Sequence, residues 1–176
     1  MRKRTRARQF ALEVLYQVDL CGPDVLEDSL ADMVERAGEP DVSSFASALV
    51  RGTLEKLPEL DPIIREVAQN WDLSRMTTID RNILRLGGYE LLYRDDIPPK
   101  VSINEAIELG KRYSTAESGT FVNGILDRIK NSFGPPGKKE AVPRSGGLQT
   151  HGDRAASGDT DVTGEPSGGS TGGAEP

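Results

Sequence analysis

The chain has 176 residues, which is enough for one domain and a further segment. It contains 22 Lys and Arg and 28 Asp and Glu, which give a formal net charge of −6. The only histidine, His151, lies in a Gly- and Pro-rich stretch, so the rest of the chain excludes Ser-His-Asp and Cys-His catalysis and most zinc sites. Cys21 is the only cysteine, which excludes an internal disulfide, and no apolar run approaches the roughly 20 residues of a membrane-spanning helix.

The chain begins with a basic arm, residues 2–8, which has no negative charge and carries Arg2, Lys3, Arg4, Arg6 and Arg8. On an acidic chain, this concentration indicates contact with a polyanion at one place. Nucleic acid is the leading candidate, because neutralised phosphates release condensed counterions. A solvated terminus is the alternative interpretation. In a helix, Arg4 and Arg8 share a face, whereas Arg6 lies about 160–200° round the axis.

Apolar residues spaced by three and four, with Gly and Pro between the runs, predict three helices in the first third of the chain. The first spans about 4–20, the second begins at an Asp24 cap and ends before Gly38, and the third starts at Asp41 or Ser43 and is closed by Pro58.

The same periodicity predicts four further helices. Asp61-Pro62 is expected to start the fourth, because Asp accepts from free N–H groups and Pro fits the first helical position. Thr77-x-x-Asp80 and Ser102-x-x-Glu105 resemble capping boxes that open the fifth and sixth. The seventh follows a break at 114–119 and ends near Phe133.

No segment alternates with period two, so the sequence predicts an all-α fold of about seven helices in two packed subdomains. Trp71 is expected in the core. Gly87-Gly88 inside the fifth helix costs about 1 kcal/mol per glycine relative to alanine. Close helix–helix approach is the expected compensation, and a partner-docking surface is the alternative.

The C-terminal stretch differs in composition from the rest, since 16 of the 43 residues from Gly134 onward are Gly or Pro and none is aromatic. Such a segment buries too little apolar surface to offset chain entropy. We therefore expect two parts: a helical domain with the basic arm over residues 1–136, and a disordered tail over 137–176.

Two stretches are more particular than helical periodicity requires: VSINEAIELGK at 101–111 and FVNGILD at 121–127. With the basic arm, Leu15-Tyr16-Gln17 and RLGGYEL at 85–91, they resemble the NusB family of transcription antitermination factors. The resemblance covers nearly all of residues 4 to 133 in the same order. The double glycine departs from the common pattern of that family.

The resemblance implies a cytoplasmic, all-helical RNA-binding factor that is not an enzyme and holds no metal or cofactor. Such a factor binds the single-stranded boxA element of ribosomal RNA transcripts together with NusE, a small-subunit ribosomal protein. The pair joins the RNA polymerase antitermination complex. The family includes monomers and dimers, so a homodimer is an open alternative.

Candidate site residues follow from the arm and from the resemblance. The predicted RNA-binding residues are Arg2, Lys3, Arg4, Arg6, Arg8, Thr120 and Phe121, the last two at the start of the seventh helix, which in the family lies near RNA. Core packing is the alternative for Phe121. The predicted NusE-facing residues are Tyr16, Tyr89 and Glu90. Ser102 and Glu105 are assigned to capping and not to a ligand site.

Two other functions remain as alternatives. A helical protein-interaction scaffold would use the basic arm to bind an acidic protein. An accessory RNA-binding domain of an RNA-modifying enzyme would fit related proteins in which a NusB-like domain precedes an RNA cytosine methyltransferase.

Overall fold

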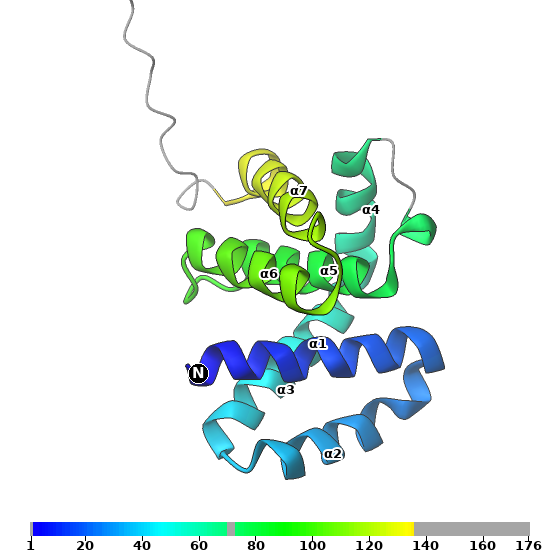
Figure 1. Ribbon diagram of the computed structural model, residues 1–176, viewed down its shortest axis with the longest axis vertical. Helices are drawn as coiled ribbons and strands as arrows, with labels where there is room; N and C mark the ends of the chain where they lie inside the picture. Colours follow the sequence, from blue (N-terminus) through cyan, green and yellow to red (C-terminus); the bar gives the residue numbers. More distant parts are fainter. Residues whose placement is uncertain (1, 70–72, 136–176) are drawn as a thin grey trace, which may run out of the picture. The chain divides into compact units, whose positions relative to one another are not determined.

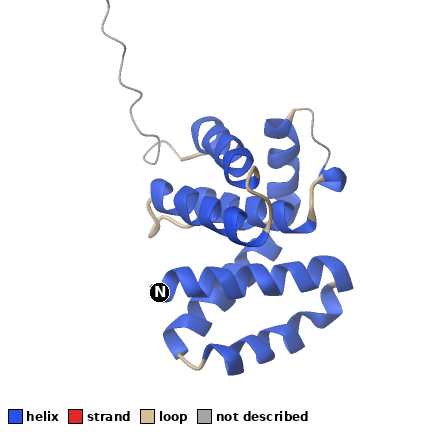
Figure 2. Ribbon diagram, viewed as in Figure 1, coloured by secondary structure: helices blue, strands red, loops and turns tan. Residues whose placement is uncertain are grey.

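The computed structural model describes residues 2–69 and 73–135, and within these ranges it contains helices and loops but no strand (Figure 2). The elements are α1 (Lys3–Cys21), η1 (Pro23–Val25), α2 (Leu26–Ala37), α3 (Pro40–Glu55), α4 (Leu57–Ala68), η2 (Leu73–Arg75), α5 (Thr78–Tyr93), α6 (Pro99–Tyr113) and α7 (Ser118–Phe133). The predicted all-α fold is confirmed. Trp71 and the predicted tail, 137–176, lie outside the described residues.

The helices form two groups, α1–α3 and α4–α7, as predicted (Figure 1). The closest pairings within the groups are α1 with α3 and α6 with α7. Both α1 and α3 also pack on α5, so α5 joins the two groups. One continuous apolar core results, with fully buried side chains from both groups, among them Leu15, Leu49, Ile64, Ile83 and Leu126.

Gly87 allows α5 to approach its neighbours closely. A Cβ atom at Gly87 would lie 2.8 Å from Leu126 Cδ1 on α7 and 3.5 Å from Ala106 Cβ on α6. At Gly88 it would lie 3.3 Å from Leu60 Cδ2 on α4. Close helix packing therefore accounts for both glycines, which supports the expectation from the sequence.

Two prolines that were expected to mark the ends of helices stand instead in the first turns of the helices that follow. Pro58 stands in the first turn of α4, and Pro62, predicted to start that helix, lies inside it. The prediction of a start at Asp61-Pro62 is wrong, because Asp61 accepts two hydrogen bonds from Arg85 of α5 in place of capping. Pro40 likewise opens α3 ahead of the predicted start.

Two predicted caps are also wrong. α6 begins at Pro99, so Ser102 and Glu105 lie within the helix, and their side chains bond Glu90 and Thr5 respectively. Asp24 lies in η1, and α2 starts after it. The predicted cap of α5 is confirmed in one half, since Thr77 Oγ1 accepts from the Asp80 backbone N–H at 3.1 Å.

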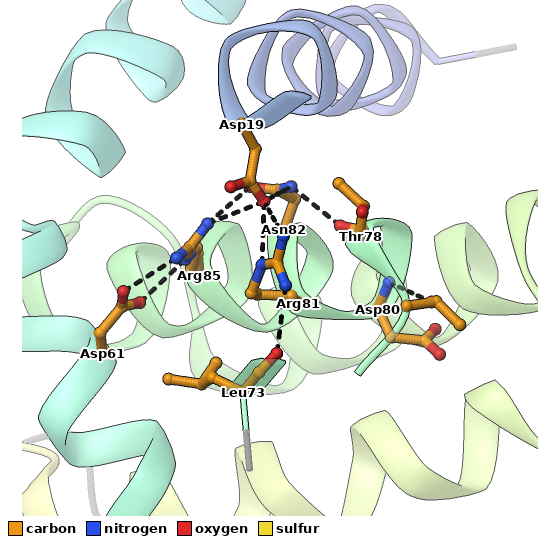
Figure 3. Close-up of polar contacts among 9 residues, drawn as sticks. Asp19, Asp61, Leu73, Thr78, Asp80, Arg81, Asn82 and Arg85 are labelled. Atoms are coloured by element: carbon orange, nitrogen blue, oxygen red, sulfur yellow. Dashed lines mark hydrogen bonds and ion pairs between the residues drawn. The ribbon is translucent and has the colours of Figure 1, made fainter. Parts of the chain in front are cut away.

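A polar network joins α1 to α4 and α5 (Figure 3). Asp19, near the end of α1, accepts from Arg81 Nε at 2.9 Å, Asn82 Nδ2 at 2.8 Å and Arg85 Nη1 at 3.0 Å. Arg85 in turn holds Asp61 through two bonds of 2.8 Å. Burial of Asp19 would raise its pKa, but the hydrogen bonds from Arg81 and Asn82 and the charge of Arg85 lower the pKa below the ordinary 3.8.

This network makes the free energy of unfolding depend on pH in the acidic range. The pKa of Asp19 is lowered in the folded state, so the ionised carboxylate stabilises the fold. This stabilisation is fully present above pH 3.8, the ordinary pKa, and is lost as the pH falls through the lower folded-state pKa. We expect Asp19→Asn to lower the unfolding free energy by roughly 1–3 kcal/mol at neutral pH. The deficit should shrink between about pH 5 and pH 2, as measured by urea unfolding. A deficit that stays constant over that range would contradict this role for Asp19.

Candidate nucleic-acid interface

The basic arm is the start of a helix and not a free segment. Arg2 occupies the N-cap position of α1 without a side-chain capping hydrogen bond, and the other basic residues lie in the first two turns. The first turn contains no acidic side chain. The free N–H groups at the start of α1 add a partial positive charge to the side chains around them. This end of α1 is therefore suited to bind an anion.

Two basic side chains of the arm are held by carboxylates of the α2–α3 junction. Lys3 Nζ lies 3.1 Å from Asp41 and 3.2 Å from Glu39. Arg6 Nη1 lies 2.9 Å from Glu39. The hydrogen bonds to Asp41 and Glu39 raise the pKa of Lys3 above its ordinary value. A phosphate would compete with these carboxylates for both side chains.

Arg4 lies on the other side of α1, beside Arg94 from the end of α5. Both guanidinium groups lie over the ring of Phe45, at 4.9 Å and 5.3 Å from its centroid. Arg94 donates two hydrogen bonds to Asp96, which lowers the pKa of Asp96, while Arg4 lies 3.9 Å from the same carboxylate. Arg4 keeps 59% of its side chain exposed, and Arg2 is also exposed. Lys3 is equally exposed but is paired with Glu39 and Asp41, so Arg2 and Arg4 are the exposed arm residues most available to a phosphate.

Arg8 is placed differently from the rest of the basic arm. Its side chain is 2% exposed and donates two hydrogen bonds to Glu90, at 2.7 Å and 2.9 Å, and Ser102 donates to the same carboxylate. This geometry ties α1 to α5 and α6. Arg8 and Glu90 were predicted to bind RNA and a partner protein, but both side chains are enclosed and engaged with each other. The structure therefore favours a structural role for this pair.

Thr120 and Phe121 lie in the first turn of α7. Thr120 is exposed, and Phe121 is half-buried, packing on the core while it lines two adjacent pockets. One pocket, of about 310 Å³, is shared with Thr120 and Arg128. The other, of about 260 Å³, is shared with Asp80 and Ser118. The two interpretations of Phe121, core and ligand contact, are both compatible with this position.

The structure does not bring the basic arm and the start of α7 together. Arg4 reaches Asp96 just before α6, whereas α7 begins just after the end of α6. The 15 residues of α6, about 22 Å long at 1.5 Å per residue, lie between Asp96 and the start of α7. A ligand that contacts both must therefore be an extended polymer.

The three residues predicted to face NusE do not form one surface. Tyr16 is 37% exposed and lines an apolar groove of about 300 Å³ with Leu12, Ile79 and Tyr113. Tyr89 instead stacks on Tyr93 and lies against Gly52 of α3. Glu90 is enclosed with Arg8. Of the three, only Tyr16 lies beside an open apolar groove.

Sequence reasoning did not find that Phe45 and Arg94 lie beside Arg4. Neither Phe45 nor Arg94 is among the site residues that the sequence predicted. Each is far from Arg4 in the sequence, so residue spacing could not predict that they lie beside it.

The NusB family model matches residues 5–131, which is most of the chain and runs from the first turn of α1 into the last turn of α7. This chain belongs to the NusB family. It is similar to the transcription antitermination protein NusB of Thermodesulfovibrio yellowstonii, with 45% identity over 72% of this chain and 91% of that protein. It is also 44% identical to the protein of that name from Myxococcus xanthus, over 77% of this chain and 100% of that one.

Solved NusB structures share the fold. NusB of T. maritima matches with a TM-score of 0.72 and 40% identity, over 77% of this chain and 95% of that one. A chain of the complex of antitermination factors NusB and NusE with double-stranded RNA matches with a TM-score of 0.68 and 31% identity, over 76% and 99%. The resemblance to the NusB family that the sequence motifs indicated is thus confirmed.

Within the residues that the structure describes, no group of three or more acidic, His or Cys side chains could hold a metal ion. None of the helices in the same ranges is both long and apolar enough to cross a membrane.

Proposed function

We propose that this chain is a transcription antitermination factor that binds boxA-type RNA with the basic arm and acts together with NusE in an RNA polymerase complex. It would act in the cytoplasm by binding, without a catalytic step. The observation that carries the proposal is the exposed pair Arg2 and Arg4 at the N-terminus of α1, in a chain of the NusB family.

Physical chemistry supports RNA as the ligand. Arginine side chains bind phosphates through paired N–H groups, and the start of α1 adds the attraction of free backbone amides. Arg4 and Arg94 both lie over the ring of Phe45, so a phosphate that displaces the Asp96 carboxylate would meet two guanidinium groups at one place. The related NusB in the solved complex is described with NusE and double-stranded RNA, which supports both partner classes.

For NusE, we propose the apolar groove beside Tyr16, between α1, α5 and α6. Its walls are mainly apolar, and Tyr16 combines an apolar ring with a polar hydroxyl, a combination that is enriched in protein interfaces. Tyr89 and Glu90 are left out of this surface, because they pack against the chain's own helices.

An electrophoretic shift assay tests the proposal against the scaffold alternative. We expect the chain to shift a boxA RNA more strongly than a scrambled RNA of equal length and composition, at low salt. Affinity should fall with salt by about 0.7 units of log K per log unit for each phosphate neutralised. Equal, weak binding of both RNAs would overturn the proposal and favour the scaffold.

A further inference from the structure

The ring of Phe45 on α3 lies beside three guanidinium groups. Arg4 and Arg8 come from α1 and Arg94 from the end of α5, and their Cζ atoms lie 4.9, 5.6 and 5.3 Å from the ring centroid. These distances are within the roughly 6 Å at which the negative face of an aromatic ring attracts a cation. Phe45 is half-buried and packs against the apolar core, so it offers a fixed surface to all three arginines.

The three arginines differ in what else holds them. Arg8 is enclosed and donates two hydrogen bonds to Glu90. Arg94 donates two hydrogen bonds to Asp96, and 20% of its side chain is exposed. Arg4 lies 3.9 Å from Asp96, beyond hydrogen-bond distance, and 59% of its side chain is exposed. Within the described residues the Arg4 side chain makes no hydrogen bond, so the ring is the contact that orders it.

Contact with a ring and contact with a carboxylate have different consequences for phosphate binding. A carboxylate occupies N–H donors, and a phosphate must displace it to reach them, as at Lys3 and Arg6. A ring attracts the cation through its quadrupole and leaves those donors free for an acceptor. The ring also restricts a long side chain in advance, so less rotamer freedom is lost when a ligand binds. An arginine held on a ring is therefore ordered and still able to bind a phosphate.

We propose that Phe45 is a positioning residue for RNA binding, which holds Arg4 at the surface with its N–H donors free for a phosphate of the RNA backbone. The carboxylates of Glu90 and Asp96 neutralise the other two arginines at the ring, so Arg4 is the cation left for a ligand. Phe45 acts through Arg4, and another aromatic ring at this position should serve as well. This inference rests on the proposed RNA-binding function and gives α3 a part in it.

A second aromatic residue near the arm provides a contrast. Phe10 on α1 lies beside Arg6 and Arg36, whose Cζ atoms are both 5.4 Å from its ring centroid. Each of these arginines is also held by a carboxylate at 2.9 Å, Arg6 by Glu39 and Arg36 by Glu13. Loss of the Phe10 ring should therefore leave both arginines in place. Because Phe10 is buried, its replacement also measures what loss of core packing alone does to binding.

Fluorescence anisotropy with labelled boxA RNA at low salt tests this role. Phe45→Leu keeps apolar volume but removes the ring, so it should weaken binding about fivefold. Phe45→Tyr retains a ring and should bind within about twofold of the parent chain. Phe10→Leu is the matched control and should also stay within about twofold. Circular dichroism checks that each variant keeps its helices.

A double-mutant cycle separates positioning from packing. Arg4→Gln alone should weaken binding at least as much as Phe45→Leu does. In a chain that already carries Arg4→Gln, Phe45→Leu should have little further effect, under about twofold, because Phe45 acts through Arg4. A merely structural role for Phe45 would instead give the same loss with and without Arg4.

A measurement on the free parent chain does not depend on how any variant folds. The ring current of Phe45 should shift the Arg4 Hδ protons upfield in the NMR spectrum. Arg4 Hδ protons at their random-coil position, Phe45→Leu binding as tight as that of the parent chain, or equal losses in the two arms of the cycle would overturn the positioning role. Failure of the parent chain to bind RNA would instead overturn the proposed function.

Discussion

Replacing Glu90 by alanine is expected to lower the unfolding free energy by about 3–5 kcal/mol. The substitution leaves the Arg8 guanidinium enclosed, 2% exposed, without its two hydrogen bonds to a carboxylate. An uncompensated buried charge is among the most costly changes a helical core can suffer. Chemical unfolding followed by circular dichroism measures the loss, and alanine at the exposed Glu66 of α4 is the matched control, expected to change stability by under about 0.5 kcal/mol.

A double variant distinguishes the cost of an unpaired buried charge from the cost of losing the ion pair itself. Arg8→Met with Glu90→Leu removes both charges and keeps apolar volume, so it should be more stable than Glu90→Ala alone, since a buried pair replaced as a pair is often nearly neutral. A Glu90→Ala variant that unfolds within about 0.5 kcal/mol of the parent would contradict the structural role of this ion pair.

The second large effect is expected in RNA binding. Arg2→Gln with Arg4→Gln should weaken binding of boxA RNA at low salt by about tenfold or more and reduce the salt slope by about 1.4, or 0.7 for each phosphate contact. These are the exposed cations of the basic arm that make no ion pair shorter than 3.9 Å within the described residues, whereas the equally exposed Lys3 is paired with Glu39 and Asp41. Anisotropy titrations at several salt concentrations measure both quantities.

A control of equal charge is available in Arg51→Gln with Arg65→Gln, two exposed positions on α3 and α4. This pair changes the net charge equally but lies outside the basic arm, so it should leave the salt slope nearly unchanged. Arg8 is kept intact in both variants, because its loss would leave Glu90 buried without its partner, destabilise the domain and imitate a loss of binding. Equal losses in the two double variants would remove the arm from the proposed mechanism.

Much of the fold could be predicted because helical periodicity is a local property. The apolar stripe that includes Leu15 identified α1, and the Thr77 cap placed the start of α5 correctly. The errors occurred at prolines and at polar residues with distant partners. Pro62 was expected to open a helix that Pro58 opens, and Asp61 was assigned to a cap although it binds Arg85.

The candidate site was less predictable, because its decisive contacts join residues far apart in sequence. Five basic residues at the N-terminus gave the arm, but the sequence could not show that Arg8 meets Glu90, 82 residues away. Nor could it show that Lys3 and Arg6 meet Glu39. Accessible charge depends on which carboxylates the fold brings near, so the arm offers fewer accessible cations than its composition indicates.

The most direct test of the account is a titration of labelled boxA RNA with this chain, with and without NusE, beside a scrambled RNA of equal length. The account predicts that boxA binds more tightly than the scrambled RNA and that NusE tightens binding of boxA further. It also predicts that the Arg2 and Arg4 double variant loses most of the affinity in both titrations. Binding that is the same for both RNAs and unaffected by NusE would contradict the account.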